Sequence, residues 1–420
     1  MSPRLLRVTV AALIASMCLG ALTACGKSEC GGEQGDVKAG PGVTAKTLNL
    51  GILTDLSGTF AALGKPIVRA TQLYWKEQNA NGGVCGRKVN LVIKDHGYNP
   101  QRAVTQYRDI EPDIAALHQL LGSPVSVALL PSIDKDKMYT GLTAWTPALV
   151  GDPHIQITGA TYDLEMINGV DYLVEKGLLS KGDTIGHIYF EGDYGEGALM
   201  GSKDVAEKQG LKLVEQKIKA TDTDMSGPVS ALKRAGVKAI LMTTAPQQTA
   251  AAAGVATAQG LDVPIMSSGP GFAPQLLATP AAAALKKHLY VSASLSPYSL
   301  DKPGPTEVRD AWEKAYPGAP ASGVSVDFAW ANAQLMTEVL SKACDNKDLS
   351  RQGIVDALHQ ISGEDLDGIV AGPLDYTKTG QPPSRTVYIA RVNTKKPGGL
   401  ETLTPDGYES DNAKGYKPAQ

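Results

Sequence analysis

The chain has 420 residues, of which 43% are hydrophobic and 20% are charged, with 45 Gly and 26 Pro. This composition is typical of globular proteins and excludes collagen, a coiled coil and wholesale disorder, and the length allows two domains or one large α/β unit. The formal net charge of −3, without a dense Lys/Arg cluster, excludes the basic surface of a nucleic-acid-binding protein. We therefore expect a small molecule or another protein as the partner.

The first 24 residues have the parts of a secretory signal peptide. Two arginines precede an apolar run over 8–22, which is too short to span a membrane as a stable helix. The run leads into the sequence LTAC, which ends at Cys25 and resembles the bacterial lipobox. The resemblance implies that 1–24 is removed and that Cys25 is lipidated, which would anchor the protein to the outer face of the cell membrane. Secretion without a lipid is the alternative.

Residues 25–46 predict a flexible tether, because they are rich in Gly, Lys, Glu and Ser and hold few apolar side chains to bury. No later apolar run reaches the roughly 18 residues that a spanning helix needs. We therefore expect the rest of the chain to be soluble, in the periplasm or at the cell surface.

From 48 onward, short β-branched and apolar runs alternate with helical patterns. This alternation predicts an α/β fold with parallel sheets covered by helices on both faces. In the first half, strands are expected at 48–53, 88–95 and 115–121, and helices at 65–80, 100–111 and 125–133.

A second set of elements of similar size follows. Strands are expected at 184–190, 212–217, 239–243, 264–267 and 289–292, and helices at 171–176, 195–209, 225–235, 247–259 and 271–277. Two later helices at 327–340 and 350–360 precede a turn-rich stretch over 368–383 and an alternating run over 386–392. Residues 394–420 are polar and rich in Gly and Pro, so we expect a surface extension there.

Several motifs occur in one order over 47–393. They are GILTDLSG at 51–58 with Gly64, NGG at 81–83 with GRK at 86–88, Asp95 with Asn99, Pro100 and Ala103, Gly122 with Ser123, DYGEG at 193–197, and GPL at 372–374. The ordered set resembles the type I periplasmic binding proteins of ABC importers, specifically the leucine/isoleucine/valine-binding group.

The resemblance implies two Rossmann-like lobes with parallel sheets, joined by three crossover strands near 158–163, 294–298 and 367–372. Lobe 1 would contain 47–158 and 297–366. Lobe 2 would contain 159–296 and 367–393. A ligand would lie between the lobes, which close around it by a hinge motion.

The resemblance also implies a ligand site between the lobes. Ser123 would stand where a strand turns into a helix, and free N–H groups and the positive end of the helix dipole favour a carboxylate there. Ala144 and Thr146 match the second carboxylate loop, and Tyr194 matches an aromatic residue that closes over the ligand. The alternatives are a plain N-cap for Ser123 and a surface role for Tyr194.

The sequence departs from the family at the ligand's ammonium group. The stretch that should carry an acid there is SSGPGF at 267–272, and the stretch 244–246 lacks the family's second tyrosine. Asp193 could pair an ammonium instead. Otherwise the ligand is not an α-amino acid, and an amide, a carboxylate or a larger compound remains open.

Three cysteines other than Cys25 follow the signal peptide, outside the cytosol where oxidation is favoured. We expect Cys85 to pair with Cys344, because each follows a helical segment that would belong to the same lobe. A pair between Cys30 and either of the others stays open.

Neither a G-x-S-x-G elbow, an H-E-x-x-H helix nor a paired C-x-x-C occurs, and the six histidines lack the spacing of metal ligands. A glycine pattern at 195–201 could suggest a dinucleotide loop, but it equally permits a tight strand–helix turn. We therefore expect no catalytic residues, no metal and no cofactor, and a protein that is not an enzyme.

The expected function is that of a lipid-anchored solute-binding component of an ABC importer. It would bind a small amino-acid-like or carboxylate ligand as a monomer and dock its closed form on an ABC permease. A module that reports ligand to a membrane sensor without transport is the alternative, and an exported enzyme using the same cleft ranks third.

Overall fold

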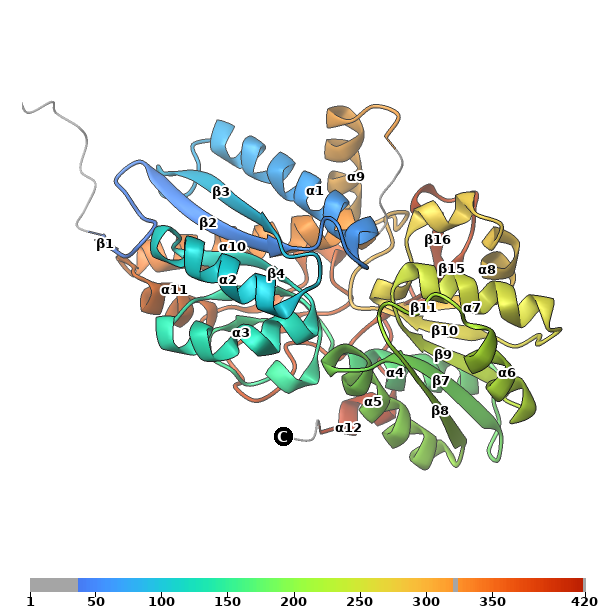
Figure 1. Cartoon of the computed structure of the whole chain (residues 1–420). Helices are drawn as coiled ribbons and strands as arrows, with labels where there is room; N and C mark the ends of the chain where they lie inside the picture. Colours follow the sequence, from blue (N-terminus) through green and yellow to red (C-terminus); the bar gives the residue numbers. More distant parts are fainter. Residues whose placement is uncertain (1–36, 320–323, 418–420) are drawn as a thin grey trace, which may run out of the picture. The chain divides into compact units, whose positions relative to one another are not determined.

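A computed structural model describes residues 37–319 and 324–417 (Figure 1). The predicted signal peptide, Cys25 and Cys30 lie outside these residues. In the described part of the chain, none of the helices is both long and apolar enough to cross a membrane.

The first sheet has five parallel strands in the order β3-β2-β4-β5-β6. Its strands are β2 (Thr47–Thr54), β3 (Lys88–Asp95), β4 (Ala116–Leu121), β5 (Thr140–Thr143) and β6 (Ile155–Gln156). The helices of this region are α1 (Ala61–Ala80), α2 (Pro100–Ile110), α3 (Ser123–Asp136), α9 (Pro303–Ala315), α10 (Val324–Asp345) and α11 (Arg351–Leu358). Asn99 caps α2: its side chain accepts a hydrogen bond from the Arg102 N–H.

The second sheet has seven strands in the order β16-β15-β11-β10-β9-β7-β8. They are β7 (Thr184–Phe190), β8 (Lys212–Ile218), β9 (Ala239–Thr243), β10 (Ile265–Ser268), β11 (Leu289–Ala293), β15 (Tyr388–Val392) and β16 (Leu400–Thr402). The first five are parallel, and β15 and β16 add an antiparallel edge. The helices are α4 (Tyr162–Glu175), α5 (Asp193–Gln209), α6 (Ser226–Arg234), α7 (Pro246–Ala258), α8 (Ala282–His288) and α12 (Asp411–Gly415). The expected α/β fold with two sheets is confirmed.

Short elements complete the described chain. Two small ladders pair β1 (Lys38–Ala39) with β12 (Asp348–Leu349) and β13 (Ser362–Glu364) with β14 (Leu374–Asp375). The 3-10 turns are η1 (Glu111–Asp113), η2 (Pro147–Leu149), η3 (Gly269–Gly271), η4 (Pro274–Ala278), η5 (Leu366–Gly368) and η6 (Pro397–Gly399).

The three predicted crossover segments meet at Ser294. Its hydroxyl donates to the Ala160 carbonyl at 2.8 Å, and its carbonyl accepts from the Ala371 N–H at 2.9 Å. A further bond joins the Ser296 N–H to the Ile369 carbonyl at 2.8 Å. The approach is so close that a Cβ added at Gly159, whose φ is +106°, would lie 2.4 Å from the Ser294 Cβ. The connections between the two sheets are therefore hydrogen-bonded to one another.

The described parts of the predicted tether and of the predicted surface extension pack against the rest of the chain. In the predicted tether, β1 pairs with β12 and Val43 packs against the core. In the predicted surface extension, β16 joins the second sheet and α12 packs on α4. Polar contacts hold α12 there, among them the bond from the Ser410 N–H to Asn168 Oδ1 at 2.8 Å.

The predicted lobe boundaries also differ from the observed contacts at 374–383. The prediction places this stretch in lobe 2, but Tyr376 donates from its hydroxyl to the Ile157 carbonyl at 2.8 Å, next to β6. The Tyr376 N–H donates to the Ile361 carbonyl, beside β13. Pairing of β14 with β13 thus holds this stretch against the first sheet.

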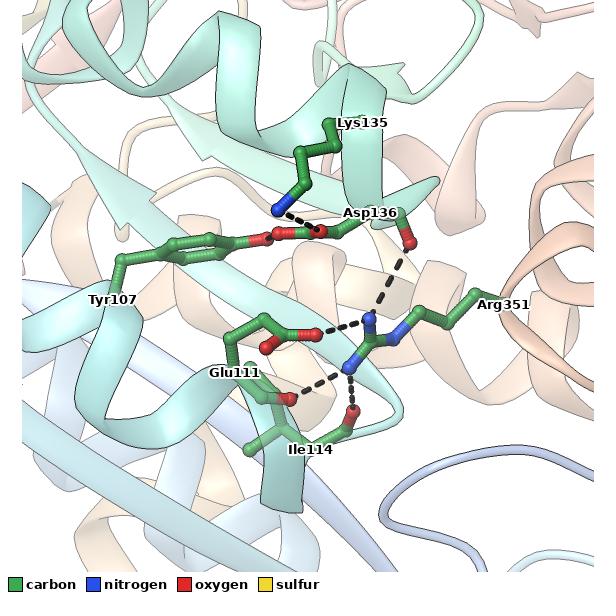
Figure 2. A network of polar contacts seen from close by, with 6 residues as sticks. All are labelled: Tyr107, Glu111, Ile114, Lys135, Asp136 and Arg351. Carbon is green, nitrogen blue, oxygen red and sulfur yellow. Dashed lines mark hydrogen bonds and ion pairs between the residues drawn. The ribbon is translucent and has the colours of Figure 1, made fainter.

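An arginine ties α11 to the first sheet's helices (Figure 2). Arg351 donates to the Glu111 carboxylate and carbonyl and to the Ile114 and Asp136 carbonyls. Asp136 also accepts from the Tyr107 hydroxyl at 3.0 Å. Because a guanidinium has five fixed donors, one side chain satisfies acceptors at the ends of both α2 and α3.

A disulfide joins Cys85, which follows α1, to Cys344 near the end of α10. This is the pair that the sequence favoured. The two helices pack against each other, with Trp75 and Leu340 buried between elements of the first region. The bond closes a sequence separation of 259 residues.

Replacing both cysteines, as Cys85→Ser with Cys344→Ser, is expected to lower the free energy of unfolding by about 2–5 kcal/mol, because the cross-link restricts the unfolded chain. Guanidinium denaturation of the oxidised wild type and the double variant measures this difference. Equal midpoints and slopes would show that the bond contributes nothing.

Candidate ligand-binding site

A cavity with an empty volume of about 670 Å³, part of which is open solvent, is lined by residues from both sheet regions. Most of its wall is aromatic or aliphatic. The apolar and aromatic lining residues are Phe60, Leu63, Ile67, Tyr98, Leu121, Trp145, Tyr162, Tyr194, Pro270, Phe272, Ala293, Leu295, Val324 and Phe328. A wall of this kind favours a ligand with a substantial hydrocarbon part.

One polar region of the wall lies at the start of α3. Ser123 Oγ and Thr143 Oγ1 are buried there, and neither has a hydrogen-bond partner among the described residues. The two residues are adjacent, since the Gly122 N–H donates to the Thr143 carbonyl at 3.2 Å. Two unpartnered hydroxyls beside the positive end of a 14-residue helix suit a carboxylate.

The local sequence explains this geometry. Gly122 has a φ of +101°, and a Cβ at this position would lie 2.6 Å from the Tyr98 ring. Only glycine therefore allows β4 to turn into α3 with Tyr98 against the turn. Pro124 fits the first helical turn, where its missing N–H leaves no bond unmade.

The second polar region of the wall is Glu165 on α4. The side chain is buried, and its carboxyl accepts from the Gly269 N–H at 3.2 Å and from the Ser294 N–H at 3.3 Å. Burial raises the pKa of Glu165 to about 8 despite these bonds. The acid is therefore largely neutral at pH 7.

Aromatic rings bring the two sides of the cavity into contact. Phe60, at the start of α1, lies 6.0 Å from Tyr194 on α5 and 6.3 Å from Phe190 between ring centroids. Tyr194 is held by a 2.7 Å hydrogen bond to Ser268 Oγ and lies 4.6 Å from the Tyr162 ring. Residues of both sheet regions therefore contact one another across the cavity.

The predicted site residues fall into two groups. Ser123 and Tyr194 line the cavity. Ala144, Thr146 and Asp193 are not among its lining residues: Ala144 is buried in the core, and Thr146 donates from its hydroxyl to the Asp193 carbonyl at 3.4 Å. The acid in the wall is Glu165, not Asp193, because α5 directs Tyr194 rather than its neighbour into the cavity.

The segment 267–272 does reach the cavity, through Gly269, Pro270 and Phe272, and brings no carboxylate. Sequence reasoning missed four lining residues, namely Thr143, Glu165, Phe60 and Trp145. Thr143 is at the end of β5 beside the end of β4, so the rule that parallel strands end at one edge could have found it. Glu165 carries no such signal, because it sits within a helix whose residues 162–173 are all buried.

Three side chains that could together bind a cation lie outside this cavity. Asp134, Asp152 and His154 have ligand atoms within 4.8 Å of one another. His154 Nδ1 is already 3.1 Å from Asp134 and 3.3 Å from Asp152. Ion pairing within the cluster accounts for this arrangement when the histidine is protonated.

Replacing Ser123 with alanine is expected to weaken binding of a carboxylate ligand by about 1–3 kcal/mol, because the carboxylate loses a buried donor. Calorimetric titration of the Ser123→Ala protein measures the change. Ser202→Ala is the matched control, since Ser202 is a buried helical serine that bonds to the Ala198 carbonyl outside the cavity. Equal losses in both variants would remove Ser123 from the site.

The chain is similar to known proteins in both sequence and structure. The profile of the periplasmic binding protein family matches residues 47–397. The fatty acid ABC transporter substrate-binding protein from Thermomonospora curvata is 44% identical, with a TM-score of 0.88 over 91% of this chain and 97% of its own.

Two further proteins are similar to this chain at lower sequence identity. The Leu/Ile/Val-binding protein homolog 8 of Brucella abortus (strain 2308) is 25% identical over 297 residues, which are 66% of this chain and 72% of the relative. A branched-chain amino acid ABC transporter from Thermus thermophilus with bound valine is 18% identical, with a TM-score of 0.77 over 89% of this chain and 99% of its own. The last likeness concerns the fold alone.

Proposed function

The chain belongs to the periplasmic binding protein family, and from this premise we propose that it delivers apolar monocarboxylates of the fatty-acid class to an ABC importer. Members of this family are solute-binding proteins of ABC transporters and not enzymes. The ligand class and the importer role are the proposed parts.

The observation that carries the proposal is the composition of the cavity wall. An aromatic and aliphatic surface surrounds the buried hydroxyls of Ser123 and Thr143, which have no hydrogen-bond partner among the described residues. The wall lacks an acid at the family's ammonium position in 267–272. The 44% identity to a protein described as a fatty acid substrate-binding protein supports the same class.

In the proposed mechanism, the carboxylate binds first to the N-terminus of α3. The hydrocarbon chain then lies along the aromatic and aliphatic wall, to which both sheet regions contribute. Since each buried CH₂ contributes about 0.8 kcal/mol, contacts to both sides would stabilise the closed form. Bending would occur at the crossover segments around Ser294.

Saturated fatty acids are expected to bind more tightly as the chain lengthens, by up to about fourfold in Kd per CH₂ until the cavity is full. Calorimetry on the mature chain, refolded to strip bound ligand, tests this against leucine, valine and benzoate. Tighter binding of leucine than of a fatty acid with the same number of carbons would contradict the ligand class.

We also propose that the mature protein is anchored through a lipid on Cys25 and acts as a monomer at the outer face of the membrane. The lipobox-like sequence LTAC supports the anchor. In membrane fractionation, Cys25→Ala is expected to move the protein to the soluble fraction, whereas the control Cys30→Ala should leave it with the membrane. Membrane retention of the Cys25→Ala protein would contradict lipidation.

A further inference from the structure

Glu165 is a buried acid in the cavity wall without a cation to balance it. Its residue is 2% exposed, and it lines the cavity from α4. Among residues 37–319 and 324–417, none of the ion pairs includes it. Burying an unpaired carboxylate in an apolar site is strongly unfavourable, so the neutral acid is the form that fits this wall.

The surroundings of Glu165 can satisfy a neutral carboxyl group. Its two oxygens accept the Gly269 and Ser294 N–H groups. The same Ser294 donates from its hydroxyl to the Ala160 carbonyl, so the hydroxyl oxygen keeps a lone pair that can accept the acid proton of Glu165. A hydrocarbon chain can then pass without leaving a buried donor unpaired.

The other groups that face Glu165 do not supply a counter-charge. They are Tyr162 and Asp163 on α4 itself and Tyr194 on α5. The ends of β10 and β11 present backbone N–H groups and serine hydroxyls. The helix α12 packs on α4, but its one cation, Lys414, is exposed and pairs with Asp411 at 2.9 Å. Burial raises the pKa of both Tyr162 and Tyr194 well above 10.

We propose that Glu165 is a specificity-determining residue, which binds the uncharged tail of a monocarboxylate only while it carries a proton. This inference rests on the proposed function and adds to it the reason why the tail must be free of charge. Ionised Glu165 under a hydrocarbon tail would lose its remaining solvation, so binding should favour the protonated form.

The sign of the pH dependence follows from this linkage. The pKa of Glu165 is raised to about 8, so the protonated form is nearly complete at pH 7 and falls about tenfold per pH unit above 8. A fatty-acid carboxylate is ionised over this whole range. An amine-bearing ligand would give the opposite sign, because its ammonium would expel the proton from Glu165.

The test uses decanoate and the mature wild-type chain in calorimetry at pH 7 and pH 9. The affinity is expected to be about tenfold weaker at pH 9. Proton uptake, measured in two buffers of different ionisation enthalpy, should be about one per ligand at pH 9 and close to none at pH 7. Glu165→Gln should bind decanoate equally at both pH values and take up no proton. Glu175→Gln, at the exposed end of the same helix, should keep the wild-type dependence.

An unchanged wild-type affinity between pH 7 and pH 9 would overturn the role of Glu165 while leaving the fatty-acid function in place. Binding of leucine with release of a proton would overturn it as well. Absence of decanoate binding at either pH would refute the ligand class itself. The proton uptake of the wild type decides the question even where Glu165→Gln does not fold.

Discussion

The hydrogen bonds around Ser294 are the constraint on which the remaining structure depends. One residue joins three crossing segments through its hydroxyl, its carbonyl and its N–H, which reach Ala160, Ala371 and Glu165. The same residue also lines the cavity. Under the proposed function, movement of the two sheet regions at this residue would therefore change the surroundings of the ligand's tail directly.

The polar groups of the cavity wall lie at two separate places, and under the proposed function their difference would orient the ligand. Ser123 and Thr143 offer unpartnered hydroxyls near a positive helix end, while Glu165 contributes an acid that burial keeps neutral at pH 7. A carboxylate is favoured at the first place and disfavoured near an acid that can ionise. Under the proposed function, an amphipathic ligand consequently has one preferred orientation between the two sheets.

The fold could be predicted from the sequence further than the site could. The strand predicted at 184–190 matches the observed β7, which is buried over 185–190 and contains no Asp, Glu, Lys or Arg, as is typical of a strand with both faces covered. Helix α4 was expected only at 171–176, since residues 162–173 are buried on all sides and show no amphipathic period. For the same reason Glu165 could not be recognised, whereas Ser123 and Tyr194 follow recognisable strand–helix turns.

The disulfide between Cys85 and Cys344 also sets an order of events during synthesis. The face of α1 that packs on α10 is made early, but α10 emerges more than 200 residues later. Until then, Tyr74 on α1 lacks Trp330 and Thr337, the α10 residues that its side chain contacts. The first sheet region therefore cannot finish folding ahead of the second, although most of its strands lie nearer the N-terminus.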